Sequence, residues 1–327
     1  MVLSNDCKIA FIGTGIMGAP IAGHLLDAGY SLTVHNRTRE KADGLVARGA
    51  VWADTPAKAA RDADVVFTML GYPSDVEDVY LATDGLIRAS KKGAWLIDLT
   101  TSSPQLARDI HDAAEVEDRH AFDCPVTGGQ QGAIDGTLTL IAGITSKDAK
   151  PVLPLLQTFS SQIYWFERAG AGQTAKLCNQ ISLAASLAGA AEMLAVAEQS
   201  GISPELVAQM VGAGMGGSVQ LSRVATRALE GDYAPGFLAE HLRKDLMLAL
   251  ATAEDLELTL PETETSFNLI DMLCQAGGSR KGTQAVTLLY TDEATSTAAG
   301  LDWSLLKAEP QDADPARQRY YTGTKNL

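Results

Sequence analysis

The stretch AFIGTGIMGAP, residues 10–20, carries the spacing G-x-G-x-x-G at Gly13, Gly15 and Gly18. The spacing alone is weak evidence, because glycine-rich turns of other kinds share it. Here a strand-like apolar run precedes the glycines and a helical pattern follows them. In a phosphate-binding turn the first glycine permits the bend, the second lets a pyrophosphate approach, and the third lets helix and strand pack closely. The context therefore favours a dinucleotide-binding turn.

The remainder of the first half alternates between short apolar runs and helical patterns. We expect strands at 8–13, 31–37, 51–53, 64–70, 94–100, 120–126 and 138–143. Helical patterns occupy 17–30, 38–50, 55–63, 73–82 and 103–117. Strands that are apolar throughout, alternating with helices, predict a parallel sheet covered on both faces. The fold class is therefore α/β, with a Rossmann-type N-terminal domain.

The pattern changes near residue 168. A helical run of roughly 30 residues, past the usual helix length, is followed only by helical patterns with glycine and proline between them. We expect a Rossmann domain at 1–168, an all-α substrate and oligomerisation domain at 169–291, and a polar C-terminal tail at 292–327. The long helix joins the two domains.

Composition narrows the possible functions. The 327 residues are 46% hydrophobic and carry a net charge of −14. An acidic surface argues against a nucleic-acid partner but permits a small anionic substrate in a locally cationic pocket. The four cysteines are widely spaced and show no metal-ligand pattern, so we expect reduced thiols and no metal site. No signal peptide is visible and no continuous apolar run reaches about 18 residues, which predicts no membrane span and a cytoplasmic location.

The residues after the second strand bear on the cofactor. NAD-preferring sites usually place an acidic residue there, to accept from the ribose 2′-hydroxyl. This chain has Asn36, Arg37 and Thr38 instead. Arg37 can hold a 2′-phosphate by charge-assisted hydrogen bonds, and Thr38 can donate another. The cofactor expected is NADP(H), with NAD possible if Arg37 is merely a solvated surface residue.

Further candidate cofactor contacts follow from position. Ile16 and Met17 lie inside the glycine turn, and Leu70 follows the fourth strand. In IDLTTSSP, residues 97–104, hydroxyl groups at the end of a strand can face the nicotinamide. Ser103 before Pro104 can instead cap the next helix.

Two segments are candidates for the substrate side. Thr127, Gly128 and Gly129 offer a hydroxyl and exposed N–H groups that suit a carboxylate, although a simple glycine-rich crossover would look the same. Lys176 and Asn179 lie three apart on the long helix and so share a face. A lysine beside a bound carbonyl can donate or accept the proton that accompanies hydride transfer. Cys178 points away from that face, which predicts a core position.

These motifs, taken together, resemble the β-hydroxyacid dehydrogenases, which include 3-hydroxyisobutyrate dehydrogenase, tartronate semialdehyde reductase and the glyoxylate/succinic semialdehyde reductases. The resemblance covers roughly residues 7–290 and rests on five motifs in the family's order. They are FIGTGIMGAPIA, DLTTSSP, DCPVTGGQQGAIDGTL, GAGQTAKLCNQ and HLRKDL. Gln180 departs from the family's frequent second asparagine, and Thr127 replaces its usual serine.

The resemblance implies a role for each matching residue. Lys176 corresponds to the catalytic lysine and Asn179 to a substrate-binding asparagine. The turn at 127–129 corresponds to the carboxylate-binding turn. Thr101 corresponds to a position beside the nicotinamide, and Lys244, with Asp245 next to it, corresponds to the lysine that reaches the cofactor. A lysine–aspartate pair on a helix surface is the alternative for Lys244 and Asp245.

The expected protein is an NADP(H)-preferring oxidoreductase that interconverts a small β-hydroxyacid, or a related hydroxyacid, with its semialdehyde. The family implies a homodimer or homotetramer. Two alternatives stay open. One is an imine reductase-like NADPH enzyme, which the presence of Lys176 argues against. The other is a non-catalytic dinucleotide-binding module.

Overall fold

The computed structural model describes residues 6–307, and the chain divides into two compact units. Unit 1 is Met1–Lys176 and unit 2 is Leu177–Leu327. The division falls inside a helix that runs from Ala171 to Gln199. The two units are therefore described separately.

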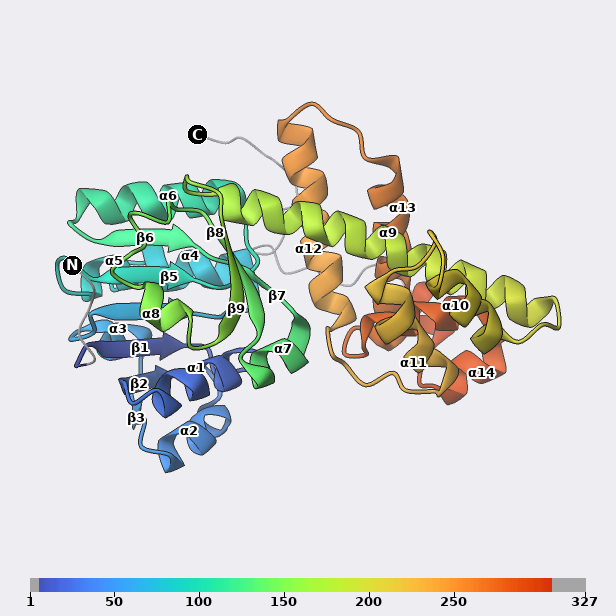
Figure 1. Cartoon of the computed structure of the whole chain (residues 1–327), viewed down its shortest axis with the longest axis horizontal. Helices are drawn as coiled ribbons and strands as arrows, with labels where there is room; N and C mark the ends of the chain where they lie inside the picture. The colour runs from blue at the N-terminus through green and yellow to red at the C-terminus, as the bar shows by residue number, and fades with distance from the viewer. Residues whose placement is uncertain (1–5, 308–327) are drawn as a thin grey trace. The chain divides into compact units, whose positions relative to one another are not determined.

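Unit 1 contains a six-stranded parallel sheet in the order β3-β2-β1-β4-β5-β6 (Figure 1). The strands are β1 (Lys8–Ile12), β2 (Ser31–His35), β3 (Val51–Trp52), β4 (Val65–Thr68), β5 (Trp95–Asp98) and β6 (His120–Asp123). The order reverses between β1 and β4, which is where dinucleotides bind in sheets of this type. The prediction of a Rossmann-type sheet is confirmed.

Helices cover both faces of this sheet, and alternate strand residues enter two separate cores. Ile9 and Phe11 belong to one core, while Ala10 and Ile12 of the same strand belong to the other. The helices are α1 (Gly18–Asp27), α2 (Asp43–Ala47), α3 (Pro56–Ala60), α4 (Pro73–Leu81), α5 (Leu86–Ala89) and α6 (Pro104–Val116). Side chains that alternate across a pleated strand explain why these strands are apolar throughout.

A second, three-stranded sheet corrects the predicted strand list. It joins β7 (Val126–Thr127), β8 (Leu138–Ala142) and β9 (Ser160–Trp165), with β7 antiparallel and β9 parallel to β8. The expected strand at 120–126 is divided at Cys124 and Pro125, because proline cannot donate a ladder hydrogen bond. The expected strand at 138–143 pairs here and not in the main sheet. The connections contain α7 (Gly129–Asp135) and α8 (Leu153–Leu156).

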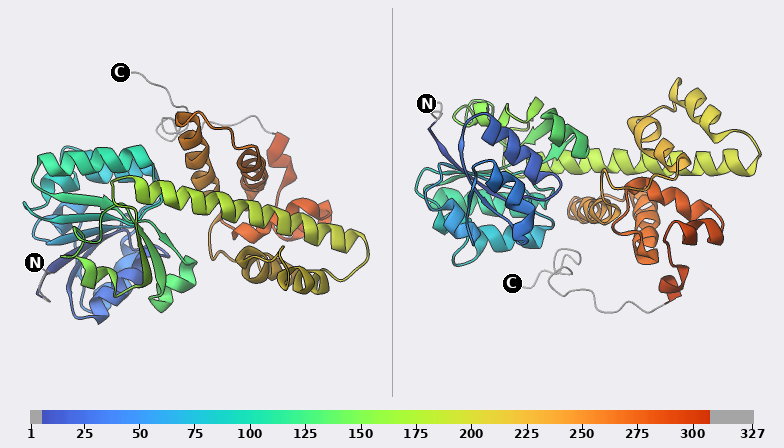
Figure 2. Two further views of the ribbon diagram at one scale, coloured as in Figure 1. Left: turned by 45° about the horizontal axis from the view of Figure 1, so that its top comes forward. Right: turned by 90° about the horizontal axis from the view of Figure 1, so that it is seen from below.

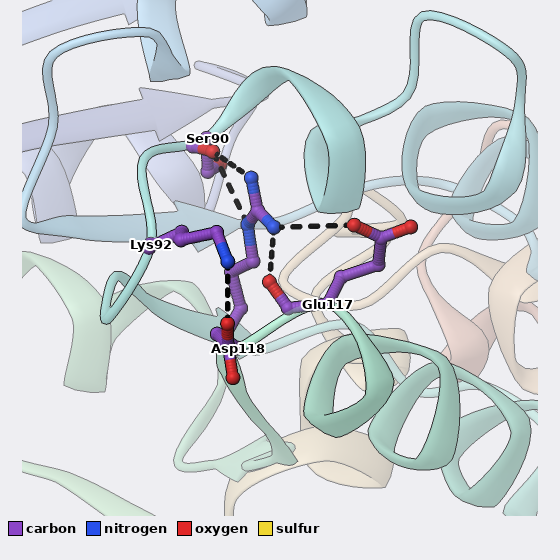
Figure 3. A network of polar contacts seen from close by, with 5 residues as sticks. Ser90, Lys92, Glu117 and Asp118 are labelled. Carbon is purple, nitrogen blue, oxygen red and sulfur yellow. Dashed lines mark hydrogen bonds and ion pairs between the residues drawn. The ribbon is translucent and has the colours of Figure 1, made fainter.

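Figure 3 shows a network of polar contacts around Ser90, Lys92, Glu117 and Asp118, near the amino-terminal ends of strands of the main sheet. Arg119 donates from Nε and Nη2 to the carbonyl oxygen of Ser90, at 3.2 and 2.6 Å, and from Nη1 to that of Glu117. Nearby, Lys92 forms an exposed ion pair with Asp118 at 2.6 Å. These contacts join the turns that precede β5 and β6, at the opposite strand ends from Asp98 and Asp123.

The elements of unit 2 among its described residues are helices, as predicted, and one isolated β-bridge pairs Leu238 with Gly282. The unit comprises most of α9 (Ala171–Gln199), then α10 (Pro204–Gly212), η2 (Gln220–Ala225), α11 (Thr226–Leu229), α12 (Ala239–Asp255), α13 (Pro261–Leu273), η3 (Cys274–Gly278), η4 (Thr283–Tyr290), α14 (Glu293–Ala298) and η5 (Trp303–Lys307). Figure 2 shows α9 as one continuous helix. The hydrophobic core of unit 2 includes Leu187, Leu242, Leu246 and Leu273.

The expected tail at 292–327 is wrong for its first part. Residues 293–298 form α14, whose Asp292 side chain caps the helix by accepting from Thr295 N at 2.8 Å. Leu301 is 2% exposed and belongs to the core of unit 2. A single buried leucine gave no periodic signal that would separate this segment from a tail. Residues 308–327 lie outside the described residues.

One helix of the described chain is long and apolar enough to cross a membrane. A window of α9 has a mean hydropathy of 1.4, and 39% of it is buried. The sequence of α9 contains no long unbroken apolar run, because Gln, Asn and Ser interrupt its apolar residues, although its mean hydropathy is high. Core helices of soluble proteins have the same length and composition, so this feature does not establish a membrane span.

Candidate active site

The three glycines of the turn in unit 1, Gly13, Gly15 and Gly18, differ in why the backbone needs glycine. Gly13 has φ +98°, and a Cβ there would lie 2.2 Å from the carbonyl oxygen of Met69. A Cβ at Gly18 would lie 1.9 Å from the carbonyl oxygen of Gly13, so α1 packs closely on the turn. Around Gly15, apart from its two neighbours in the chain, no atom of the described residues lies within 4 Å of such a Cβ. The space at Gly15 fits a pyrophosphate, and the N-terminus of α1 supplies N–H groups and a positive dipole.

The end of β2 is fastened to this turn. Asn36 accepts a hydrogen bond from Thr14 N at 3.0 Å and donates from Nδ2 to the carbonyl oxygen of Thr38 at 2.7 Å. The side chain of Arg37 is 90% exposed and lies 3.6 Å from Asp75 Oδ1. This carboxylate lies beside the arginine expected to hold a 2′-phosphate, and its position in the chain, 38 residues after Arg37, gives no sign of that contact. Within the turn, Ile16 is 46% exposed.

The ends of β4 and β5 are linked through hydroxyl groups. Leu70 N donates to Thr100 Oγ1 at 2.8 Å. The Leu70 side chain also lies beside the glycine turn, 3.3 Å from where a Cβ on Gly13 would be. Thr68 Oγ1 donates to the Asp98 carboxylate at 2.7 Å, and Thr100 N donates to the same oxygen at 3.1 Å. Burial raises the pKa of Asp98 from 3.8 to about 6, although these hydrogen bonds partly oppose the shift.

A second buried carboxylate ends the neighbouring strand. Asp123 is opposite Asp98 in the β5–β6 register and is 2% exposed. Burial raises its pKa, while hydrogen bonds from Gly170 N and Gln173 N act in the opposite direction. Those bonds, at 2.8 and 2.7 Å, satisfy free donors at the start of α9. Asp123 thus caps α9 from a distant strand.

The predicted catalytic lysine lies in the first turns of α9. Lys176 is 7% exposed, which excludes a fully solvated lysine on a long helix. Three residues earlier, Gln173 is fully buried and bonds to the backbone on both sides of Thr101. Thr101 itself is half-buried. Unit 1 therefore carries Lys176 on a helix that is attached to the Thr101 segment.

The 127–129 turn has a backbone that favours glycine. Gly128 has φ +130° and Gly129 φ +65°, and both are exposed, with Thr127 half-buried before them. The helix α7 that follows is held by His24 of α1, whose Nε2 lies 3.0 Å from the Ala133 carbonyl oxygen. The turn therefore presents backbone N–H groups at a helix start, an arrangement that suits an anion.

In unit 2, a chain of polar contacts joins the remaining predicted residues. Asn179 Nδ2 donates to Gln180 Oε1 at 2.8 Å, and Gln180 Nε2 donates to Asp245 Oδ2 at 2.6 Å. Lys244 Nζ lies 3.1 Å from Asp245 Oδ1, in an ion pair whose side chains are 5% and 3% exposed. The alternative of a solvated surface pair is therefore wrong. Burial and the Lys244 charge lower the pKa of His241.

The structure groups the predicted residues by unit. Unit 1 holds the glycine turn, the β2 end, Leu70, Thr101, the 127–129 turn and Lys176, whereas Asn179 and Lys244 belong to unit 2. Asp123 and Gln173 were not among the predicted site residues, since a strand aspartate and a helix glutamine show no sequence signal of their pairing. The expected core position of Cys178 is wrong, because its side chain is exposed.

Among residues 6–307, no group of three or more His, Cys, Asp or Glu side chains could hold a metal ion. The same residues contain four free cysteines, of which Cys7 and Cys124 are buried, and burial raises the pKa of Cys7 to about 11.

Two family models match this chain over successive regions. Residues 8–167 match the NAD binding domain of 6-phosphogluconate dehydrogenase, and residues 170–290 match the NAD-binding region of NADP-dependent 3-hydroxyisobutyrate dehydrogenase. An uncharacterized oxidoreductase of Bacillus subtilis is 41% identical over 86% of this chain and 98% of its own length. An NAD-dependent L-serine dehydrogenase of Pseudomonas aeruginosa is 34% identical, over 86% of this chain and 97% of its own length.

Solved structures agree with these matches. The 3-hydroxyisobutyrate dehydrogenase of Mycobacterium tuberculosis, solved with L-serine, superposes with a TM-score of 0.80. It is 28% identical and covers 88% of this chain and all of its own. An imine reductase from Pseudomonas has a TM-score of 0.59 and 17% identity over 86% of this chain and 98% of its own, a likeness of fold alone. The chain belongs to the β-hydroxyacid dehydrogenase family, and it is an oxidoreductase that binds a nicotinamide dinucleotide and acts on CH–OH groups.

Proposed function

We propose that this protein is an NADP(H)-preferring enzyme that interconverts a small β-hydroxyacid, or a related hydroxyacid, with its semialdehyde. The observation that carries the proposal is the burial of Lys176 at the start of a helix that Asp123 and Gln173 attach to the ends of β5 and β6. A lysine buried and held in this way is typical of a functional site rather than of a solvent-exposed surface.

The proposed chemistry divides between two sets of residues. The 127–129 turn binds the substrate carboxylate through its N–H groups, and Asn179 is a further substrate-binding residue. The dinucleotide, when bound, accepts or supplies the hydride. Lys176 donates a proton to the developing alkoxide oxygen during reduction and receives it back from the hydroxyl during oxidation. The glycine turn, Leu70, Thr101 and Lys244 hold the dinucleotide.

The cofactor preference rests on the end of β2. No acidic residue occupies positions 36–38, and Arg37 is exposed and available to a 2′-phosphate. Thr38 and Asn36 flank it. Asp75 lies beside Arg37 and competes for its charge, so the NADP preference is expected to be moderate and NAD use to persist.

We further propose a cytoplasmic homodimer or homotetramer. Unit 2 exposes several large apolar side chains that are close together in the sequence, and exposed apolar patches are typical of protein–protein contacts. These side chains lie in or next to α10 and η2: Ile202, Leu206, Met210 and Val219. A self-complementary contact through this region would bury them. Light scattering coupled to size exclusion tests this, and a monomeric mass at micromolar concentration would contradict it.

The proposal is tested by a substrate panel with NADPH and NADH in parallel. Succinic semialdehyde, glyoxylate, tartronate semialdehyde and methylmalonate semialdehyde are reduced, and L-serine and 3-hydroxyisobutyrate are oxidised. A cyclic imine represents the imine reductases. We expect turnover of at least one carboxylate-bearing substrate, higher kcat/KM with NADPH, and none of the imine. Turnover of the imine alone would overturn the proposal.

A further inference from the structure

We propose that Gln173 is a positioning residue that sets the distance between the catalytic lysine and the nicotinamide-facing segment at Thr101. The inference deepens the proposed function and rests on the role assigned there to Lys176. Asp123 supports the same arrangement by fixing the start of α9. Neither residue touches the reacting atoms, so each acts through Lys176 and Thr101.

The side-chain amide of Gln173 bonds to the backbone as a neighbouring strand would. Its Nε2 donates to the carbonyl oxygen of Thr100 at 2.7 Å, and its Oε1 accepts from Ser102 N at 2.9 Å. Residues 100 and 102 flank Thr101, so one amide holds the backbone on both sides of Thr101. The pair of bonds is buried, with Gln173 at 0% and Ser102 at 1% exposed.

The start of α9 is fixed independently by Asp123. Its two carboxylate oxygens accept from Gly170 N and Gln173 N, one oxygen each. Two glycines leave room for the carboxylate. A Cβ at Gly143 would lie 2.2 Å from Asp123 Oδ1, and a Cβ at Gly172 would lie 2.8 Å from Oδ2. Because both oxygens are held and enclosed, the first turn of α9 cannot rotate or slide without breaking these two hydrogen bonds.

The consequence for Lys176 follows from helix geometry. Gln173 and Lys176 are three residues apart on α9, which places them on one face and about 4.5 Å apart along the axis. One end of this interval is tied to Thr100 and Ser102, and the other carries the ammonium group. Gln173 therefore acts as a spacer between the proton donor and the segment expected beside the nicotinamide. A displacement of about 1 Å is enough to lower turnover about 100-fold.

The test replaces the donor of the amide without changing its shape. In Gln173→Glu the ionised carboxylate cannot donate to the Thr100 carbonyl oxygen, and it repels that oxygen. A protonated glutamic acid restores both bonds, and burial raises the pKa of such a group towards neutrality. We expect kcat of Gln173→Glu to be about 100-fold below wild type at pH 8.5, and the ratio of variant to wild type to rise at least about tenfold by pH 6.

Turnover is normalised to the number of NADPH sites titrated in the same sample, so that poorly folded protein does not count. Gln173→Asn keeps donor and acceptor but is shorter by one methylene, and we expect kcat per site to fall with little change in KM. Gln162→Glu introduces the same charge on exposed β9 and should leave kcat unchanged at every pH. A purely structural role would lower the number of sites and leave kcat per site unaltered.

Two results would overturn the inference. One is wild-type kcat per site in both Gln173 variants, and the other is a variant-to-wild-type ratio that stays constant between pH 6 and pH 8.5. Failure of the proposed function is distinguishable, because in that case wild-type protein turns over no carboxylate-bearing substrate, or Lys176→Ala is as active as wild type.

Discussion

A Cβ on Gly18 would lie 1.9 Å from the carbonyl oxygen of Gly13, whereas a Cβ on Gly15 would meet no atom of the described residues within 4 Å beyond its two chain neighbours. Within this turn we therefore expect Gly18 to matter for stability and Gly15 to matter for cofactor binding. We expect Gly18→Ala to destabilise the protein by about 1–3 kcal/mol. Gly15→Ala should keep the wild-type Tm but weaken NADPH binding at least about tenfold, because the methyl group occupies the pyrophosphate space. Thermal melts and fluorescence titrations check both, and equal Tm losses would contradict the separation.

Arg37 is expected to discriminate between the two dinucleotides. Arg37→Ala removes charge-assisted hydrogen bonds to the 2′-phosphate, each worth about 1.5–3 kcal/mol. The KM for NADPH should rise about 10- to 100-fold while that for NADH changes little. Lys41→Ala, an exposed cation a few residues on, is the matched control. If both dinucleotides weaken equally in Arg37→Ala, the NADP preference has another source.

Asp75 lies on the other side of the same question. Asp75→Asn removes the negative charge 3.6 Å from Arg37 and keeps an oxygen that can accept from Tyr72 N. We expect the ratio of kcat/KM for NADPH to that for NADH to increase, by a few-fold, since an exposed pair is largely screened. A ratio that falls would mean that Asp75 assists the phosphorylated cofactor.

Gly128 is expected to govern substrate affinity. Its φ of +130° disfavours any side chain, so Gly128→Ala should distort the carboxylate-binding turn. We expect KM for the hydroxyacid to rise at least about tenfold, with NADPH affinity unchanged. Gly93→Ala provides the control, because Gly93 also has a positive φ, +75°, but lies at the amino-terminal end of β5. Similar KM values for the two variants would argue against a carboxylate at this turn.

The folded protein is expected to lose stability as Asp98 ionises. The folded pKa of about 6 lies above the ordinary 3.8, so the contribution of this group is fully present below about pH 4 and is lost as pH rises through 6. Asp98→Asn cannot ionise and still accepts from Thr68. Between pH 4 and pH 7, wild type should lose up to about 3 kcal/mol relative to this variant in urea unfolding. Parallel pH profiles would show that Asp98 titrates normally.

Much of this fold was predictable because its signals are local. The main sheet is predicted by apolar runs such as those of β1 and β4, which are buried on both faces and are separated by helical patterns. The second sheet was harder to recognise. β7 has only two residues, and β9 shows exposed polar positions that resemble a loop. Short or half-exposed strands acquire their identity from partners far away in the sequence.

The site was predictable where a residue type carries its own chemistry. Glycines at fixed spacing and a lysine in a helical motif are such cases. Gln173 and Asp123 are not, because their importance comes from contacts with backbone groups 47 to 73 residues away. The predicted core position of Cys178 was wrong for a related reason. Its angle from Lys176 gives a direction on the helix but does not say what packs there.

The assignment of proton transfer to Lys176 is tested by the turnover of Lys176→Ala with NADPH and the best substrate of the panel. Losing a general acid lowers kcat about 10²- to 10⁴-fold. The dissociation constant for NADPH should stay within about twofold of wild type, because the glycine turn that holds the pyrophosphate is untouched. Turnover close to wild type in a variant that binds NADPH normally would contradict the account.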